Sequence, residues 1–209
     1  MKPLILIGGG GHCKSVIEAA ESVGREIRGI LDLPEYIGSD CLGYKVIGND
    51  NDIPNYVDDC EFIVTLGFIK NPAPRIRLHR LVEESGGKFV TIIASTAHVS
   101  SHATVGEGSV ILHHATVNAG AKIGKGTIIN TAANVEHDAC IGEYTHISTG
   151  AMVNGDCKIG KCCFIGSGTV INNGIKITDN CIIGSGSLVS SCISNAGTYF
   201  GTPIKTIKL

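Results

Sequence analysis

The sequence contains no tryptophan and only five tyrosines and five phenylalanines among its 209 residues. It has no run of lysines and arginines, and its net charge is −2, so nothing in it predicts binding to nucleic acid. Its longest N-terminal apolar run, Leu4 to Ile7, is far shorter than the roughly 20 residues of a membrane span and too short for a signal peptide. These absences predict a soluble cytoplasmic protein with no nucleic-acid or membrane partner.

The sequence also lacks a C-x-x-C pair, although it contains nine cysteines. Two of them, Cys162 and Cys163, are adjacent, a spacing that does not favour a zinc site. An odd number of cysteines in a chain without an export signal predicts reduced thiols instead of a disulfide framework. We therefore expect no metal cofactor.

Glycine is abundant, with 28 residues, and 43% of the chain is hydrophobic. This hydrophobic fraction and the small net charge exclude an intrinsically disordered chain. Each glycine inside a helix would cost roughly 0.5–1 kcal/mol relative to alanine, which excludes a helical bundle. Most of the glycines should therefore lie in turns.

A β-branched aliphatic residue recurs every six residues through the C-terminal half, sixteen times without an insertion. Neither an α-helix, with period 3.6, nor an ordinary strand, with period 2, gives this spacing. Hexapeptide repeats are typical of a parallel β-helix, in which three short faces form one triangular coil of about 18 residues. The repeating residues are Val99, Val105, Ile111, Val117, Ile123, Ile129, Val135, Ile141, Ile147, Val153, Ile159, Ile165, Ile171, Ile177, Ile183 and Val189.

A small residue stands two positions before the β-branched residue in fifteen of the sixteen repeats. We expect the β-branched side chain to point into the prism and the small one to let the chain turn. Cys157, Cys163 and Cys181 occupy the small position, which predicts that they are inert packing residues. A narrow interior also explains why Tyr144 and Phe164 are the only aromatics between residues 99 and 194.

The N-terminal part, residues 1–94, has a different pattern that predicts a Rossmann-like βαβ domain. Residues 95–209 are expected to form the β-helix domain, whose segment after Asn195 leaves the six-residue register and caps the open end. The predicted N-terminal elements are strands at 4–7, 27–31, 62–66 and 89–93 and helices at 15–23 and 75–84.

A glycine-rich turn, Gly8 to Gly11 followed by His12, separates the first predicted strand from the first helix. Backbone N–H groups and the helix dipole at such a turn can hold phosphates. The dinucleotide fingerprint G-x-G-x-x-G fails, because its last glycine would fall on Cys13. A nucleotide-sugar site is therefore a better interpretation than an NAD site, and a merely tight turn is the structural alternative.

The segment Glu136-His137-Asp138 contains charged residues that the β-helix itself does not require. Its first residue, Glu136, stands in a predicted column of polar residues whose other members are asparagines. Residues 18 apart lie one coil apart and should stack on one face, and this column consists of Asn118, Glu136, Asn154 and Asn172. A carboxylate next to an imidazole orients the ring and raises its basicity. His137 is therefore a candidate general base, and the alternative is an ordinary surface histidine.

Taken together, these motifs resemble the hexapeptide-repeat sugar acyltransferases, of the sialic-acid O-acetyltransferase and UDP-4-amino-sugar N-acetyltransferase type. The resemblance rests on Gly10-Gly11-His12, on Asp32 after the second strand, on Val135-Glu136-His137-Asp138 and on Gly201-Thr202-Pro203. It implies a left-handed β-helix, a homotrimer, acetyl-CoA as co-substrate in the groove between neighbouring prisms, and a nucleotide-linked sugar held by the N-terminal domain.

The resemblance also implies roles for individual residues. His137 would be the general base, Asp138 its acidic partner, and Asn130 and Glu136 supporting residues. The positions that match acetyl-CoA contacts are His146, Gly155, Ser167 and Ser185. The positions that match the nucleotide-sugar loops are Gly10, Gly11, His12, Asp32, Leu33 and Gly67.

Two departures from the amino-sugar enzymes leave the nucleotide and the sugar open. Leu33 stands where those enzymes tend to have a second acidic residue, and Phe68 stands where they have asparagine. The acceptor group could be an amine or a hydroxyl, so an alternative is O-acetylation of a sialic acid or its CMP form. Two further alternatives are a catalytically silent trimeric binding scaffold and, more weakly, a nucleotide-cofactor oxidoreductase.

Direct transfer is the expected mechanism, with His137 removing a proton from the acceptor as it attacks the thioester. We expect a donor near His146, or a backbone N–H, to stabilise the oxyanion. A covalent cysteine route is disfavoured, because Cys140 should lie on a different face from His137. Cys13, beside the glycine-rich turn, is the one thiol that the packing pattern does not explain.

Overall fold

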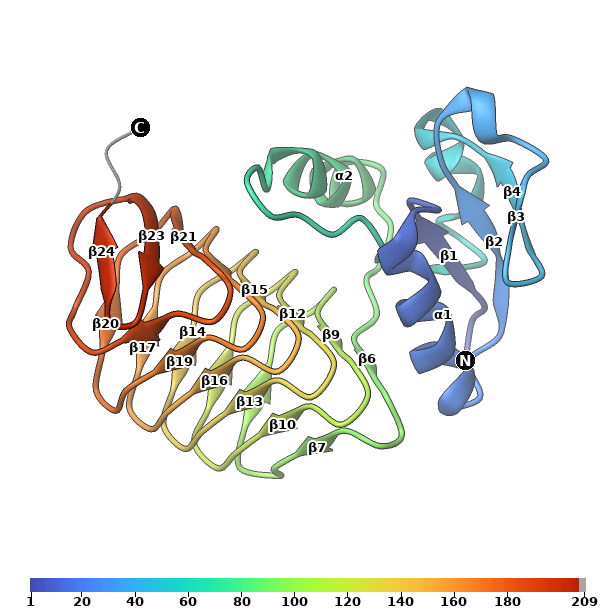
Figure 1. Ribbon diagram of the computed structural model, residues 1–209. Coiled ribbons are helices and arrows are strands. Elements are labelled where there is room, and N and C mark those ends of the chain that lie inside the picture. Colours follow the sequence, from blue (N-terminus) through green and yellow to red (C-terminus); the bar gives the residue numbers. More distant parts are fainter. Residues whose placement is uncertain (207–209) are drawn as a thin grey trace.

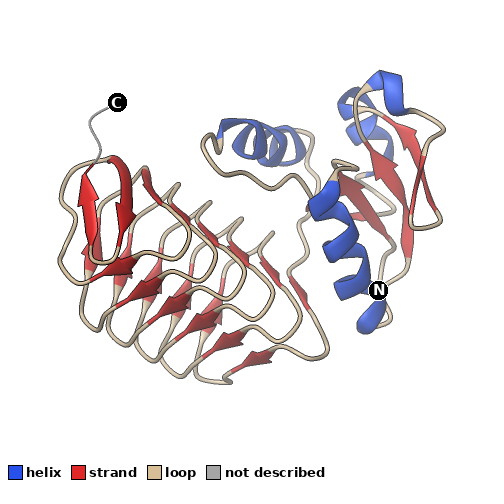
Figure 2. Cartoon of the chain, viewed as in Figure 1, coloured by secondary structure: helices blue, strands red, loops and turns tan. Residues whose placement is uncertain are grey.

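The computed structural model describes residues 1–206, with side chains through residue 203. The last residues of the predicted second domain, 207–209, lie outside this range. Two parts follow one another along the chain, a small sheet flanked by helices and a long three-sided prism (Figure 1). Both helices, α1 and α2, belong to the N-terminal part, and the prism is built from short strands and turns (Figure 2).

The N-terminal part is a five-stranded sheet in the order β3-β4-β2-β1-β5, parallel except for β3. Its elements are β1 (Leu4–Ile7), α1 (Gly11–Ser22), β2 (Ile27–Leu31), η1 (Pro34–Tyr36), β3 (Asp40–Cys41), β4 (Tyr44–Gly48), η2 (Asp50–Tyr56), β5 (Glu61–Val64) and α2 (Ala73–Glu84). Strands β2, β4 and β3 lie on one side of β1, and β5 lies on the other side. The carboxyl ends of β1 and β5 therefore flank a switch point, where ligands bind in folds of this type.

The sequence pattern located β1, β2, β5 and α2 closely and α1 in part, confirming the Rossmann-like class. The predicted strand over residues 89–93 is wrong in its place. Phe89 forms only an isolated bridge with Phe62 of β5, and β6 (Ile92–Ile93) instead pairs with a strand of the prism. The antiparallel pair of β3 and β4 was not predicted, because its short strands lack a strong apolar run.

The prism is a left-handed parallel β-helix, and its three faces are separate sheets. The first face contains β6, β9 (Val110–Ile111), β12 (Ile128–Ile129), β15 (His146–Ile147), β18 (Phe164–Ile165), β21 (Cys181–Ile183), β23 (Gly197–Gly201) and β24 (Ile204–Thr206). The second contains β7 (His98–Val99), β10 (Thr116–Val117), β13 (Asn134–Val135), β16 (Met152–Val153), β19 (Val170–Ile171) and β22 (Leu188–Val189). The third contains β8 (Thr104–Val105), β11 (Lys122–Ile123), β14 (Cys140–Ile141), β17 (Lys158–Ile159) and β20 (Lys176–Ile177).

The six-residue pattern is confirmed at all sixteen positions, since each β-branched residue ends or lies within one of the strands β7 to β22. Partner strands are 18 residues apart, as in the pairing of Ile129 with Ile147. The inward column is buried along the prism and forms one continuous core. Beyond the repeats, Tyr199 of β23 packs on the end of this core.

From Ser109 onward the small residues before the β-branched ones are buried as well, and most of their hydroxyls and thiols bond to a turn carbonyl 15 residues further along. Thr145 Oγ1 donates to Gly160 O over 2.7 Å, and Cys163 Sγ donates to Thr178 O over 3.2 Å. This local partner explains how hydroxyls and thiols are tolerated in an apolar core. Cys157, Cys163 and Cys181 are fully buried, in agreement with a packing role.

Neither α1 nor α2, at 12 residues each, is long enough to cross a bilayer, and the described part of the chain has no other α-helix.

Candidate functional site

Three corners join the faces of the prism, and the Glu136-His137-Asp138 segment forms the corner between the second and third faces. His137 Nδ1 and Asp138 Oδ2 are 2.9 Å apart, and both side chains are exposed. Because a carboxylate only accepts, Nδ1 carries the proton in the neutral ring and Nε2 keeps a free lone pair. The hydrogen bond to Asp138 raises the pKa of His137.

Glu136 belongs to the predicted polar column and stays ionised. Its two carboxylate oxygens each accept a 2.8 Å hydrogen bond, from Asn118 one coil earlier and from Asn134 on the second face. These bonds, the one from Asn134 first, lower the pKa of Glu136. Its negative charge adds to the rise in the pKa of the neighbouring His137.

Gly155 lies one coil beyond, against the imidazole of His137. A Cβ placed on Gly155 would stand 2.6 Å from Nε2 of His137. The absence of a side chain at this position therefore lets the ring lie over the next coil. Gly155 accordingly sits apart from the other predicted acetyl-CoA residues, which gather on the first face.

A cavity of about 770 Å³ lies between the N-terminal part and the prism. The N-terminal part contributes the turn after β1 and the loop after β5, and the prism contributes its first face and the corner between its first and second faces. The lining residues are Gly10, Gly11, His12, Ser15, Thr65, Leu66, Gly67, Phe68, Ile69, Asn130, Thr131, His146 and Thr149. The fold thus joins the predicted nucleotide-sugar residues Gly10, Gly11, His12 and Gly67 to Asn130 and His146.

Asp32 shapes a smaller cavity of about 370 Å³ that adjoins the first one at Gly10. One carboxylate oxygen of Asp32 accepts from Gly9 N over 2.6 Å and the other from Leu33 N over 2.7 Å. Tyr36, which is half exposed, lies on the same wall. Leu33 itself is half exposed, and its backbone, not its side chain, takes part in this arrangement.

His146 is buried at the centre of the first face, with 7% of its surface exposed. Its Nδ1 donates to the carbonyl of Phe68 over 2.9 Å, so the neutral ring has an unprotonated Nε2 that accepts from Asn130 Nδ2 over 3.0 Å. Burial lowers the pKa of His146 to about 4. The neutral ring has no spare N–H, so a predicted oxyanion donor near His146 would have to be another group.

Asn130, predicted to be a supporting residue, hydrogen-bonds to His146 and lies away from His137. The two residues lie 16 apart, close to one 18-residue coil, on neighbouring coils. His137 lies a full face away, at the far edge of the second face. Within a single chain, the pair His137–Asp138 and the cavity at His146 are therefore separate.

A third cavity, of about 670 Å³, runs along the first face away from His146. Ser167 and Ser185 line it together with His146, so three of the four predicted acetyl-CoA positions come together. Ser148 Oγ and Ser167 Oγ are 3.0 Å apart. Apolar walls are contributed by Ile69, Phe164, Ile182 and Phe200.

Sequence reasoning missed Thr131 and Thr149, which line the main cavity. The 18-residue spacing could have found them, because Thr131, Thr149, Ser167 and Ser185 form one column at the corner between the first and second faces. Sequence reasoning named Phe68 only as a departure from the amino-sugar enzymes, whereas in the structure the carbonyl of Phe68 accepts from His146 and its ring meets that of His146 edge-on.

The remaining candidates do not add chemistry. Burial raises the pKa of Cys13 to about 12, so its thiol stays protonated and is not a nucleophile. Residues 1–206 contain no group of three histidine, cysteine or carboxylate side chains arranged to hold a metal ion.

Comparison with known proteins gives matches over both parts of the chain. Residues 3–81 match the family model described as the PglD N-terminal domain. Residues 156–191 match the model described as the bacterial transferase hexapeptide, six repeats. A search of curated protein sequences finds no match.

Solved structures resemble the whole chain. The acetyltransferase domain of PglB from Neisseria gonorrhoeae has a TM-score of 0.91 at 30% identity, covering 99% of this chain and 100% of that chain. A mutant of perosamine N-acetyltransferase from Caulobacter crescentus, in complex with CoA and GDP-perosamine, has a TM-score of 0.93 at 28% identity, covering 100% and 98%. WeeI from Acinetobacter baumannii, at 21% identity and TM-score 0.85 over 99% and 100%, shares the fold.

Proposed function

Because the chain belongs to the hexapeptide-repeat sugar acyltransferases, we propose that it transfers the acetyl group of acetyl-CoA to an amino group of a nucleotide-linked sugar. The single observation that carries this proposal is the His137–Asp138 pair, whose Nδ1 is bonded and whose Nε2 is free. A perosamine N-acetyltransferase complexed with CoA and GDP-perosamine is 28% identical over the whole chain, which supports an amine acceptor.

The reaction needs one general base and no covalent intermediate on the protein. His137 Nε2 removes a proton from the acceptor amine as its nitrogen attacks the thioester carbonyl. A C–N bond forms, the C–S bond breaks, and CoA leaves as the thiolate, which takes up a proton. Asp138 stabilises the imidazolium that forms on His137, because its carboxylate accepts from Nδ1.

A backbone N–H is the oxyanion donor that we favour. Both ring nitrogens of His146 are occupied, whereas the N–H of Gly155 forms no hydrogen bond with the described residues. Gly155 also lies in contact with His137. An N–H at this position could bind the developing negative charge close to the base.

Substrate binding is assigned to the cavities of the first face. The glycine-rich turn ends in α1, whose first turn has no acidic side chain and no side-chain cap. Its free N–H groups suit the diphosphate of a nucleotide sugar. The groove along Ser167 and Ser185 has the apolar walls that a pantetheine arm requires, so acetyl-CoA is placed there.

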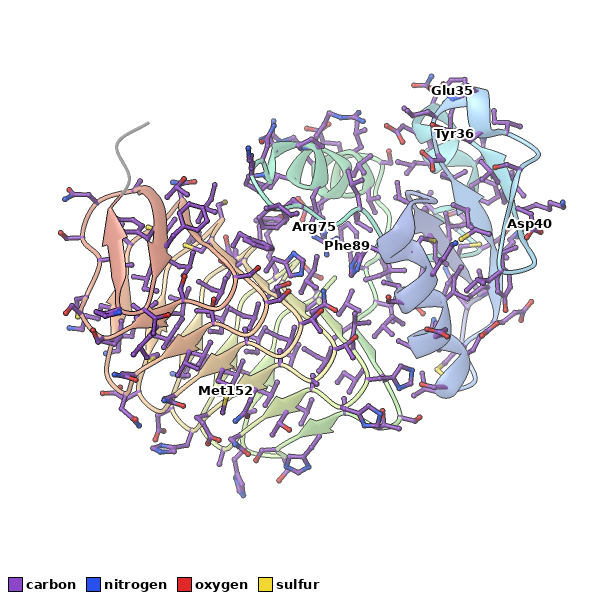
Figure 3. All side chains as sticks on the ribbon, in the orientation of Figure 1. Glu35, Tyr36, Asp40, Arg75, Phe89 and Met152 are labelled. Carbon is purple, nitrogen blue, oxygen red and sulfur yellow. The ribbon has the colours of Figure 1, made fainter. Side chains whose placement is uncertain are left out.

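A homotrimer would bring these parts together. The second face exposes Met152 at 43% (Figure 3) and leaves Val170 and Leu188 partly exposed, which is an apolar strip suited to self-association. If three second faces surround one axis, the His137 corner of one chain lies next to the first-face cavity of its neighbour. The base and the two substrates would then meet between chains.

The test is a free-thiol assay of CoA release over a panel of UDP-, GDP- and CMP-linked sugars. We expect His137→Ala to abolish CoA release while the variant keeps its secondary structure and its assembly size. His102→Ala is the matched control, because His102 is exposed at the same corner two coils earlier. Near-normal turnover by His137→Ala would remove the general-base assignment.

The panel also separates the alternatives. Release with CMP-sialic acid alone would favour the O-acetyltransferase, and no release with any sugar would favour the silent scaffold. A silent scaffold has no need for the ordered His137–Asp138 pair, which is why we favour an acetyltransferase over it.

A further inference from the structure

Arg75 of α2 is fully buried at the joint between the N-terminal part and the prism (Figure 3). Its guanidinium donates to two carbonyls of the N-terminal part, Val64 O at 2.7 Å and Leu66 O at 3.0 Å. It also donates to two carbonyls of the prism, Gly126 O at 3.0 Å and Gly108 O at 3.4 Å. One side chain therefore ties the end of β5 to two successive coils.

The acceptors of Arg75 are all backbone carbonyls, and no carboxylate among the described side chains forms an ion pair with it. Burial lowers the pKa of Arg75 to about 9, so the guanidinium remains charged at neutral pH. A buried charge without a counter-ion is a poor way to stabilise an interface that apolar residues could fill. What the guanidinium provides instead is a rigid fork that fixes the direction of several bonds.

Two glycines of the prism leave room for the side chain of His79 beside Arg75. Gly108 and Gly126 are 18 residues apart at the corner between the third and first faces, with φ of 66° and 62°. A Cβ on Gly108 would lie 2.8 Å from Cε1 of His79, which is one turn after Arg75 on α2, and a Cβ on Gly126 would lie 3.2 Å from the same atom. The next coil has Tyr144 at this corner, and its ring meets His79 edge-on.

The loop from Leu66 to Phe68 is held at both ends by this joint. Arg75 bonds the carbonyl of Leu66, and His146 bonds the carbonyl of Phe68. Between these two anchors, Gly67 lines the main cavity and lies against the side chain of His12. A shift of Arg75 would therefore move the wall of the cavity formed by residues 66–68.

We propose that Arg75 is a positioning residue for the nucleotide-sugar site, acting through the Leu66–Phe68 loop that it anchors to the prism. The proposal rests on the function proposed above. Arg75 therefore affects the binding site of the nucleotide sugar. The acetyl-CoA groove along Ser167 and Ser185 is largely independent of Arg75, because the prism provides most of that groove.

The kinetic test compares Arg75→Met and Arg75→Lys with Arg77→Met. Arg77 lies on the same helix but is exposed and bonds Asp50, so it controls for loss of a cation from α2. All constants are measured well below the melting temperature of each variant, with the panel sugar that gives the highest rate. We expect Arg75→Met to raise the KM for the nucleotide sugar about tenfold, the loss typical of a bond to a charged group.

Two expected results support the proposal and two others would overturn it. The KM for acetyl-CoA should stay within about twofold of wild type, and Arg75→Lys, which keeps the charge but not the fork, should give an intermediate KM for the sugar. A lowered melting temperature with both KM values unchanged would show that Arg75 only stabilises the fold and would overturn the proposal. An equal rise in both KM values would overturn it as well.

Hydrogen exchange provides a readout that does not depend on turnover. Without any substrate, the amide of Thr65, which donates to Ile7 O and lies between the two carbonyls that Arg75 binds, should exchange about tenfold faster in Arg75→Lys than in wild type or Arg77→Met, while the other amides of the sheet stay protected. Unchanged exchange at Thr65 would overturn the proposal even if the enzyme is active. If wild type releases no CoA with any sugar, the proposed function fails, and this exchange experiment still decides whether Arg75 anchors the loop.

Discussion

Gly155→Ala is a small change whose effect on catalysis follows from the geometry at His137. The added Cβ would lie 2.6 Å from Nε2 and 2.7 Å from Cε1 of His137, and the three atoms nearest to it all belong to that ring. Ordinary van der Waals contact begins near 3.4 Å, so the ring must move by about 0.8 Å (3.4 − 2.6). Because the histidine is exposed, it can make this movement without disturbing the core.

A displacement of about 1 Å at a reacting group can lower a rate about 100-fold, so we expect kcat to fall by about that factor. The melting temperature should change little. The assay is CoA release at saturating concentrations of both substrates, with circular dichroism to follow the fold. Gly174→Asn is the control, because Gly174 lies at the same type of corner, has no atoms within 4 Å of the added Cβ, and has a positive φ that asparagine tolerates.

A kcat for Gly155→Ala within threefold of wild type would refute the reasoning. It would mean either that His137 is not the base or that its position over Gly155 does not matter for the reaction.

Two further predictions concern pH. His137 must be unprotonated to act as a base, and its pKa is raised, mainly by the hydrogen bond to Asp138. The value of kcat/KM should therefore rise with pH, with a midpoint above the ordinary histidine pKa of about 6.5. Asp138→Asn should move this midpoint to lower pH and reduce the maximal kcat/KM at high pH. A midpoint that does not move in Asp138→Asn would contradict this pairing. His12, His79 and His146 are buried as neutral rings, and burial lowers their pKa values to about 3, 3 and 4. In the unfolded chain each of these three histidines would bind a proton near pH 6.5. The free energy of unfolding should therefore be highest above that pH and fall below it, by up to about 4 kcal/mol per pH unit for the three together. Urea unfolding at pH 7.5, 6 and 5 measures this, and a midpoint that stays constant would contradict it.

The six-residue count predicted the sixteen strands β7 to β22 of the prism, because each inward position of a β-helix repeats the same steric demand and so leaves a signal in the sequence. The same logic placed Cys157, Cys163 and Cys181 in the core and put Glu136 one coil from Asn118. The pattern failed at residues 89–93, where an apolar run passes from one sheet to another. Apolar character shows that such a segment is buried but not which sheet it joins.

The candidate site could be predicted only in part. His137 and Asp138 are neighbours in the chain, so their contact is local and visible in the sequence. His146 was named as a candidate, yet its burial under Phe68 and its bond to Asn130 depend on how the N-terminal part docks on the first face. That docking includes the contacts of Arg75 and His79 with Gly108 and Gly126, four residues that no local pattern connects.

The sequence by itself thus determined the repeat, the direction of each side chain in the prism and the histidine–carboxylate pair, since all three follow from spacing along one regular backbone. The tertiary structure alone decided that His146 is neutral, that Asn130 serves His146, and that His137 lies a full face away from the cavity of its own chain. These facts depend on contacts between segments up to 78 residues apart, as between Phe68 and His146, and on backbone carbonyls, which every residue type possesses and which therefore leave no trace in the sequence.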